Sequence, residues 1–277
     1  MSTKGHDDIA AVHGENILQR TETADSVMMP VPRDVFEKLY LNPKPPGSGR
    51  LYRTFANPTP VALMGFLLSA FPTGCILLGW RGSGGNGAAI LPVYIFYGGI
   101  VQMVAAVGEW IIGNTFSCTI FFTYSTFWLV HGCSMIPWFG VGVNYSPTGD
   151  NLDGQATPEF FATTGFFFVF LGLVSLVYLV GALRTNLCLV FGLVTLILDV
   201  GFFTGIYFNF ALGDLSAAAR CQKAAGVLTF IICFPLGWLF MAEILEAVDF
   251  PLVVPVGDLS RRFRGRNQRH RNHAGEP

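Results

Sequence analysis

The sequence is poor in charge. Asp, Glu, Lys and Arg make up only 13% of its 277 residues, whereas a soluble domain usually carries roughly 25%. Hydrophobic residues make up 52% of the chain, and the mean hydropathy is +0.50. A soluble core of ordinary size does not absorb this much apolar surface. The composition indicates helices whose whole circumference meets lipid or other helices.

The patterns of common enzymes are also missing. The chain has no Walker loop, no HExxH pair and no nucleophile with a convincing base, and the glycine-rich stretch 82–87 leads into no phosphate-binding lysine. The six cysteines form no CxxC pair, and the five histidines form no cluster, so we expect free thiols and no metal. We expect no enzymatic activity, no cofactor and no nucleic-acid partner.

Six apolar runs follow a polar and proline-rich stretch at 1–56. Each run is long enough to cross a bilayer, and Gly, Pro, Asn or Asp residues lie in the breaks, where a helix must stop. The sequence predicts an all-α integral membrane protein with a six-helix transmembrane domain at 57–250. The six runs cover approximately residues 58–80, 90–112, 115–138, 159–183, 186–212 and 222–248.

Lys and Arg are concentrated in the two tails. If both termini are cytoplasmic, the inner segments carry 14 of these residues and the outer loops carry three, which agrees with the positive-inside rule. We expect residues 1–56 to be a mostly disordered tail with a short helix near 35–40. The stretch 251–277 is a basic tail, and its run RRFRGRNQRHR at 261–271 favours a topology signal over a site for partners or anionic lipid.

A few polar side chains lie at membrane depth, where burial in lipid is costly and such groups usually face a cavity or a partner. Gln102 and Glu109 share the small-residue face of the second predicted helix, and Asn114 follows in the tight turn after it. Asp199 lies near the middle of the fifth helix, with Thr195 on the same face. For these five residues we predict a polar pathway, a proton relay or hydrogen bonds that hold helices in register.

For other polar and small residues we expect simpler roles. Glu243 and Glu246 lie near the end of the sixth helix and His131 near the end of the third, so we expect all three to reach water. Gly201 and Gly205 form a G-x-x-x-G step, which lets helices approach closely in lipid.

Fixed positive charge is absent from the middle of the predicted spans, because Arg81, Arg184 and Arg220 are placed in the connections and Lys223 stands at the very start of the sixth run. A carboxylate that crosses the membrane here must be neutralised by a proton, or held by helix N-termini and neutral donors. This favours a small weak acid over a multiply charged anion, and it also leaves room for a neutral solute.

The first predicted helix opens with Asn57, Pro58, Thr59 and Pro60. Asn57 is a good N-cap, and Pro58 suits the first helical position. The free backbone N–H groups of this first turn can hold an anion at the cytoplasmic mouth of a pathway.

Three segments resemble the acetate uptake transporter family, which includes fungal acetate permeases and bacterial succinate–acetate permeases. They are NPTPVALMGF at 57–66, YGGIVQMVAAVGEWIIGNTF at 97–116 and FFTYSTFWLV at 121–130. The resemblance implies a plasma-membrane homohexamer with six transmembrane helices and one narrow pore in each subunit. It implies acetate as the substrate, and transport either by proton coupling or by channel-like passage.

The resemblance also implies an apolar constriction, which it places at Phe66, Tyr124 and Leu198. Thr59, Val61 and Ala62 depart from the family's first-helix signature, and all three lie at the pore mouth that the family implies. We expect a permease for acetate and similar small monocarboxylates, which would take protons and membrane lipid as its other partners. Two alternatives stay open: an ammonium or ammonia export pathway, which the acidic groups would suit, and an acetate sensor that transports nothing.

Overall fold

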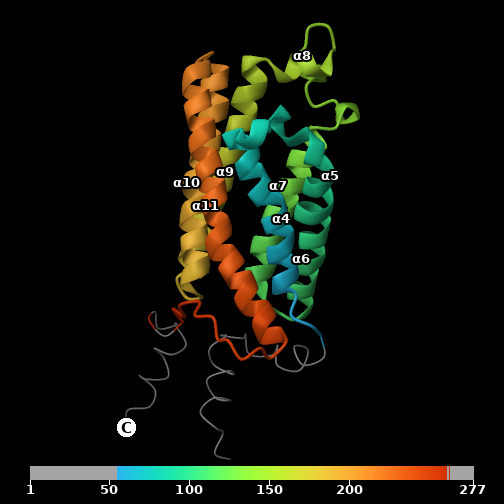
Figure 1. Cartoon of the computed structure of the whole chain (residues 1–277). Helices are drawn as coiled ribbons and strands as arrows, with labels where there is room; N and C mark the ends of the chain where they lie inside the picture. Colours follow the sequence, from blue (N-terminus) through green and yellow to red (C-terminus); the bar gives the residue numbers. More distant parts are fainter. Residues whose placement is uncertain (1–54, 261, 263–277) are drawn as a thin grey trace, which may run out of the picture. The chain divides into compact units, whose positions relative to one another are not determined.

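Six long helical segments form most of the chain that the structure, a computed structural model, describes (Figure 1). The described residues are 55–260 and 262, and they belong to the unit Asn42–Pro277. The expectations for the tail at 1–54, its short helix near 35–40 and the basic stretch 263–277 lie outside the described residues. The six segments are α4 (Thr59–Leu78), α5 to α6 (Leu91–Ile111), α7 (Thr115–Ser134), α9 (Pro158–Ala182), α10 (Leu187–Ala211) and α11 (Leu215–Ala247).

Five of these segments are apolar and long enough to cross a membrane: Thr59–Leu78, Gly85–Ile111, Pro158–Ala182, Leu187–Ala211 and Leu215–Ala247. Helix α7 has 20 residues, like α4, but seven of its residues are Ser or Thr. Among the described residues there is no strand, and one isolated bridge joins Asn186 to Asp258. The fold is therefore helical and suited to a membrane.

Short helices lie in the connections. The first connection holds η1 (Trp80–Gly82) and η2 (Gly85–Ile90), and the long connection after α7 holds η4 (Pro137–Phe139), η5 (Val143–Tyr145) and α8 (Asn151–Gln155). Both connections lie at the top of Figure 1, and the first residues of α4 lie at the bottom. We call these two ends of the unit the Asn86 end and the Asn57 end.

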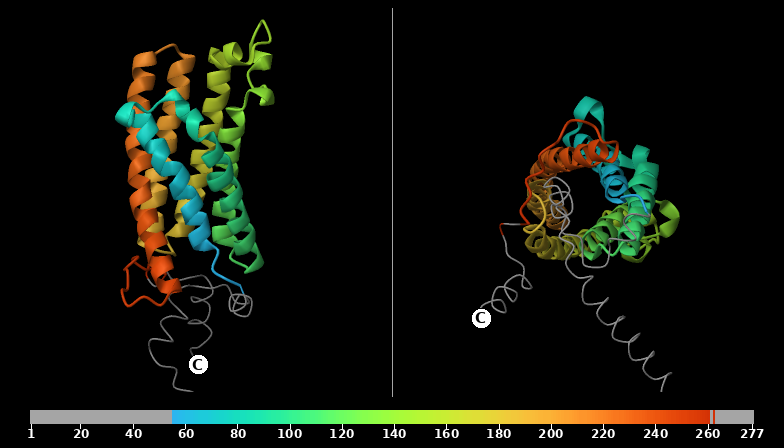
Figure 2. Two further views of the ribbon diagram at one scale, coloured as in Figure 1. Left: turned by 45° about the vertical axis from the view of Figure 1, so that its right-hand side comes forward. Right: turned by 90° about the horizontal axis from the view of Figure 1, so that it is seen from below.

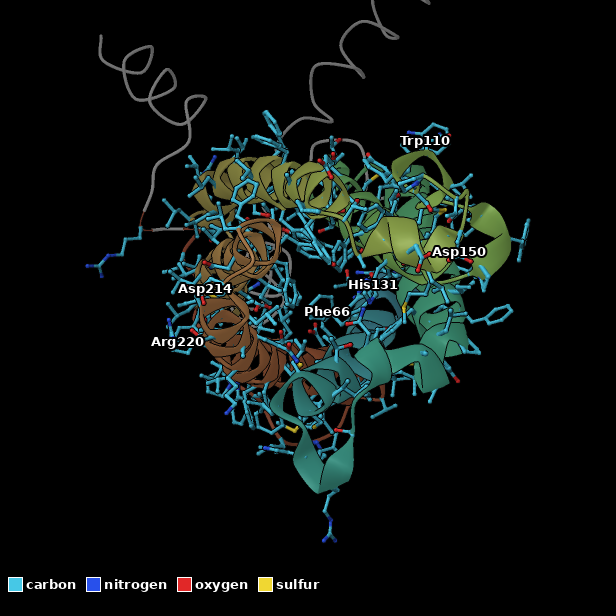
Figure 3. All side chains as sticks on the ribbon, turned by 90° about the horizontal axis from the view of Figure 1, so that it is seen from above. Phe66, Trp110, His131, Asp150, Asp214 and Arg220 are labelled. Carbon is cyan, nitrogen blue, oxygen red and sulfur yellow. The ribbon has the colours of Figure 1, made fainter. Side chains whose placement is uncertain are left out.

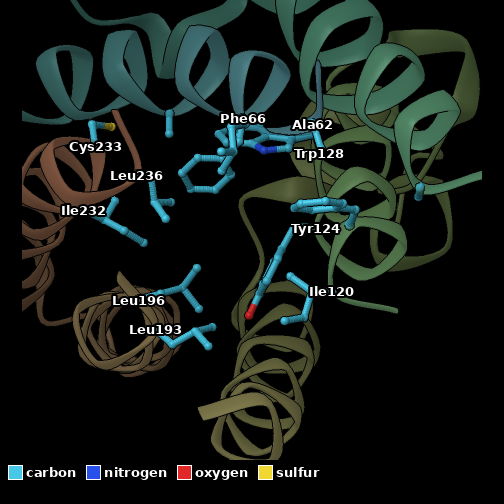
Figure 4. Close-up of a cluster of buried hydrophobic side chains, with 14 of the residues drawn as sticks. Ala62, Phe66, Ile120, Tyr124, Trp128, Leu193, Leu196, Ile232, Cys233 and Leu236 are labelled. Atoms are coloured by element: carbon cyan, nitrogen blue, oxygen red, sulfur yellow. The ribbon is translucent and has the colours of Figure 1, made fainter. Parts of the chain in front are cut away.

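The helices follow one another around a ring. Neighbouring pairs are α9 and α10, α10 and α11, α11 and α4, α4 and α6, and α6 and α7. The ring closes between α7 and α9 through two pairs of hydroxyl groups, described below. Figure 2 shows the ring from the Asn57 end. Many of the buried side chains gather on the inner faces of this ring (Figure 4).

The second segment is not a regular helix. Between α5 (Leu91–Val93) and α6 (Gln102–Ile111) lies the π-helical stretch η3 (Tyr94–Val101), and such stretches are frequent at functional sites. A Cβ atom on Gly98 would lie 2.5 Å from the Trp128 ring, and one on Gly65 would lie 2.5 Å from the Tyr97 carbonyl oxygen. Glycine at these two positions lets η3 pack directly against α4 and α7.

The predicted span boundaries need correction at two helices: α7 ends at Ser134, four residues before the predicted end at 138, and the last helix begins earlier than predicted. Helix α11 begins at Leu215, whereas the sequence suggested a start near residue 222. Asp214 caps the helix by accepting a hydrogen bond from the Ala217 N–H at 2.8 Å, and the alanine-rich stretch that follows favours a helix. Arg220 and Lys223 therefore lie on a helix and not in a loop, and both side chains are exposed.

Candidate functional site

Two cavities lie inside the ring. The larger has a volume of about 390 Å³ and reaches the loop around Asn86, and the smaller has about 40 Å³ and lies toward the Asn57 end. Phe66, Tyr124, Leu196 and Ile232 line both cavities. These four side chains come from α4, α7, α10 and α11 and converge from different sides (Figure 4). They therefore form the boundary between the two cavities, which we call the constriction.

Packing and hydrogen bonds hold the aromatic side chains of the constriction. The Phe66 and Trp128 rings meet edge to face, with centroids 6.4 Å apart. The Tyr124 hydroxyl lies 3.0 Å from the Ser175 hydroxyl on α9, and the Tyr124 ring meets Tyr178 edge to face. The Tyr124 hydroxyl is therefore engaged with α9, while the residue lines both cavities.

A group of aromatic side chains lines the larger cavity beyond the constriction. The Tyr94 ring stacks on Trp128 with centroids 5.3 Å apart, and it meets His131 edge to face. The Thr73 hydroxyl donates to the Tyr94 hydroxyl at 3.2 Å. Seen from the Asn86 end, Phe66 and His131 lie toward the middle of the ring, whereas Asp214 and Arg220 lie on its rim (Figure 3).

Three buried polar atoms have no hydrogen-bond partner among the described residues: Gln102 Oε1, Trp128 Nε1 and Asp199 Oδ1. All three residues line a cavity, Gln102 the smaller and the other two the larger. Leaving a buried polar group unpaired costs about 1–3 kcal/mol. These groups are therefore candidates for contact with a solute or water.

The cavities carry very little charge. No Lys or Arg is among the described residues that line either cavity, and Asp199 is the one acidic residue among them. An anion in this space would meet no fixed positive charge. Among the described residues no three His, Cys, Asp or Glu side chains group as metal ligands would.

A second polar group joins three helices at the Asn57 end. Glu109 on α6 is fully buried, and it accepts hydrogen bonds from the Thr59 hydroxyl at 2.5 Å and from the Asn114 amide at 2.8 Å. Asn57 donates to Glu243 on α11 at 2.6 Å. The Asn57 side-chain oxygen Oδ1 also accepts from the Thr59 N–H at 3.2 Å. Helix α4 begins at Thr59, so Pro58 takes the cap position that was expected for Asn57.

This group lies outside the lining of both cavities. Glu109 and Asn114 connect α6, α4 and the start of α7, so the helix-bonding alternative fits their positions and the pathway alternative does not. The expectation that Glu243 simply reaches water is wrong, because it is partly buried and bonded to Asn57. The sequence signal for this contact is only an acidic residue near a helix end, and it carries no information about a partner 186 positions away.

The predicted constriction needs one correction, at the fifth helix. Leu198 is 54% exposed and lines neither cavity, so its assignment to the constriction is wrong. Leu196 is 8% exposed and takes that place. Two residues along a helix correspond to a rotation of about 200°, which moves a side chain to the opposite face. The Thr195 hydroxyl donates to the Phe191 carbonyl of its own helix, and Thr195 lines neither cavity.

Several predicted residues line the cavities, and so do some residues that were not predicted. Phe66, Tyr124, Gln102 and Asp199 line the cavities. His131, expected to reach water, is partly buried and lines the larger cavity. The lining also includes Thr229 and Ile232, which sequence reasoning missed because α11 is apolar around its whole circumference and shows no distinct face.

Known proteins are similar to this chain in sequence, and a solved structure is similar to it in fold. The model of the GPR1/FUN34/yaaH family matches residues 41–261. Protein alcS of Aspergillus fumigatus is 38% identical over 256 residues, which are 90% of this chain and 94% of that protein. Acetate permease A of Emericella nidulans is 26% identical over 225 residues, which are 79% of this chain and 72% of that protein.

A solved structure of the bacterial acetate channel SatP superposes with a TM-score of 0.55 and 27% identity. The match covers 73% of this chain and 99% of the SatP chain. Since the family model spans most of the described residues and the ring of helices has a solved counterpart, the chain belongs to the GPR1/FUN34/yaaH family.

Proposed function

We propose that this protein is a membrane permease or channel for acetate and similar small monocarboxylic acids. The observation that carries this proposal is the constriction: four side chains from four helices separate two cavities that lie in line. A small apolar gate of this kind accepts one methyl group and resists water and ions. The names of the fungal acetate permease and of the bacterial acetate channel support acetate as the substrate.

We also propose that the chain crosses the plasma membrane six times, with both termini in the cytoplasm. Helix α7 supplies the sixth crossing, since it is as long as α4 and stands between α6 and α9 in the ring. In this orientation the Asn57 end is cytoplasmic and the larger cavity opens outward. Residues 57–250 form the transport domain, flanked by the two tails. We further propose a homohexamer with a separate pore in each subunit.

The transport mechanism follows from the lining. An acid enters the larger cavity, where aromatic side chains surround its alkyl group and a few neutral donors meet its carboxyl group. Phe66, Tyr124 and Leu196 then select for size at the constriction. On the far side, the Gln102 side chain offers the next polar contact. Because no lining cation holds an anion, we propose that passage is linked to a proton, so that the solute crosses the constriction as a neutral species.

Flux into liposomes tests this proposal. The purified full chain is reconstituted, and uptake of labelled acetate, propionate, lactate, succinate and ammonium is measured with and without an inward proton gradient. Liposomes without protein correct for diffusion of undissociated acid through lipid. We expect protein-dependent uptake of acetate that falls with the size of the acid and rises with the proton gradient. Uptake of ammonium without acetate would favour the export pathway, and no flux at all would favour a sensor.

A further inference from the structure

Asp199 occupies an unusual position for a carboxyl group. It lies in the middle of α10, it is 7% exposed, and it lines the larger cavity. Its Oδ2 atom accepts a hydrogen bond from the Thr229 hydroxyl at 2.9 Å, whereas its Oδ1 atom has no partner among the described residues. One half of this carboxyl group is fixed by the neighbouring helix, and the other half has a vacant hydrogen-bonding position.

The position of Asp199 relative to the constriction is set by the helix. It lies three residues after Leu196 on α10, which corresponds to a rise of about 4.5 Å along the helix. Leu196 lines both cavities and Asp199 lines only the larger one. Asp199 therefore lies about one helical turn before the constriction on the side of the Asn86 end.

The wall beside Asp199 is apolar and rigid. Phe203 and Tyr207 follow on the same helix, and both rings stack on Phe168 of α9 with centroids 5.2 Å apart. All three aromatic residues line the larger cavity. A solute at Asp199 thus finds a carboxyl oxygen without a partner next to a hydrophobic surface of stacked rings, which matches a molecule with one carboxyl group and a short alkyl chain.

We propose that Asp199 binds the carboxyl group of the incoming acid through one shared proton, and so admits a monocarboxylate only together with a proton. This inference rests on the proposed function, and it names the residue that determines in which protonation state the substrate is admitted. Two carboxyl groups in contact cannot both ionise, because their like charges repel. With one proton between them, the hydroxyl group of either partner donates to the other. Thr229 meanwhile keeps its bond to Oδ2.

The surrounding groups offer no other counter-charge. From α11 Thr229 and Cys233 lie near Asp199, and α9 contributes the Phe168 ring to the same cavity. No lysine or arginine is among the described residues that line the cavity. The remaining titratable groups that line the cavity or approach Cys233 are Cys75, Tyr94, Tyr124, His131 and Tyr207.

The experiment measures equilibrium binding of labelled acetate to the purified full chain in detergent, between pH 6 and pH 10. For the wild type, we expect the affinity to fall at rising pH, with a limiting slope of about tenfold per pH unit once both carboxyl groups ionise. In Asp199→Asn the side-chain amide can donate a hydrogen bond to the acetate anion, so binding requires no additional proton. We expect its affinity to change by less than about twofold over the same range.

Two further variants control this result. Thr229→Val removes the donor to Oδ2, and we expect the loss of affinity to move to higher pH with the slope unchanged, because the ionised carboxylate is less well stabilised. Asp153→Asn changes an exposed acidic residue of α8 and should behave as the wild type. Other titratable groups act equally in all variants, so the difference between their curves isolates Asp199.

The outcomes separate this inference from the proposed function. If the wild type binds no acetate, the proposed function fails. If it binds acetate and Asp199→Asn keeps the slope of the wild type, this inference fails while the permease stands. Ammonium chloride that displaces acetate from the wild type but not from Asp199→Asn would assign the residue to a cation, and would overturn the shared proton.

Discussion

The hydroxyl group of Tyr124 on α7 lies 3.0 Å from the hydroxyl group of Ser175 on α9, and both side chains are buried. The neighbouring Thr123 and Tyr178 hydroxyls, also on α7 and α9, lie 2.7 Å apart. These two contacts join α7 to α9, and they fix the Tyr124 ring at the constriction. The ring itself fills the space at the constriction, and the hydroxyl contacts join the two helices beside it.

Removing the Tyr124 ring should widen the constriction. We expect Tyr124→Ala to raise the ratio of propionate to acetate uptake by about tenfold, since one methylene in a tight apolar site is worth about 1–3 kcal/mol. Tyr124→Phe keeps the ring and loses only the contact with Ser175, so its ratio should stay near that of the wild type. Uptake into liposomes measures both, and an unchanged ratio in the alanine variant would count against the role of Tyr124.

The fifth helix offers a matched pair, because Leu196 lies in the constriction and Leu198 faces outward. Leu196→Ala should relax size selection in the same direction as Tyr124→Ala. Leu198→Ala should leave the uptake ratio unchanged, although it removes the same number of atoms from the same helix. The reverse result would restore Leu198 to the pathway and exclude the register described here.

The close packing of η3 against α7 should leave no room for a side chain in place of Gly98. A Cβ atom there would lie 2.5 Å from the Trp128 ring, whereas one on Gly201 would meet nothing within 4 Å. We expect Gly98→Ala to lower the free energy of unfolding by about 1–3 kcal/mol. Gly201→Ala should be neutral or stabilise by up to about 1 kcal/mol. Thermal unfolding in detergent compares the two variants, and equal melting temperatures would contradict this packing.

Glu109 should contribute to stability more than to transport. Glu109→Ala leaves the partly buried Thr59 hydroxyl without its acceptor, and the Asn114 amide keeps only its bond to the Ser117 hydroxyl. A buried polar group without a partner costs about 1–3 kcal/mol. We expect a lower melting temperature with uptake per folded protein retained. Glu246 is exposed on α11, so Glu246→Ala should change stability by less than about 0.5 kcal/mol. A stable Glu109→Ala variant without uptake would instead favour the relay role.

The cap of α11 should make stability depend on pH. The hydrogen bond from the Ala217 N–H holds the pKa of Asp214 below its ordinary value, helped by Ser216 and Arg220. A carboxyl group whose pKa is lower in the folded state stabilises the fold above its unfolded pKa, and this contribution is lost as pH falls through the folded pKa.

Asp214→Asn keeps an acceptor for the cap and does not titrate. We expect the melting temperature of the wild type to fall relative to this variant as the pH is lowered below the ordinary range of an aspartate. Parallel melting curves for the two proteins at every pH would show that the Asp214 charge has no part in stability.

Sequence reasoning and structure agree best where the signal is local. The apolar runs predicted the long helices of the ring. Prediction was weaker for partners distant in sequence. Nothing near Glu243 indicates its bond to Asn57, and nothing near Gly98 indicates the Trp128 ring.

The start of α11 illustrates a different error. The run of apolar residues begins near residue 222, so hydropathy placed the helix there, but the cap at Asp214 and the alanines after it extend the helix by seven residues. Hydropathy reports which residues tolerate lipid, whereas caps and propensity decide where a helix begins.

The amino-acid sequence alone determined the class of this protein, because hydropathy and the length of each apolar run are properties of single segments. It also determined that Phe66, Tyr124 and Asp199 were worth attention. Only the tertiary structure decided which face of each helix turns inward, and thereby replaced Leu198 with Leu196. In lipid a helix can be apolar on every side, so its rotation is chosen by the packing of its neighbours and leaves no mark in the pattern of one helix.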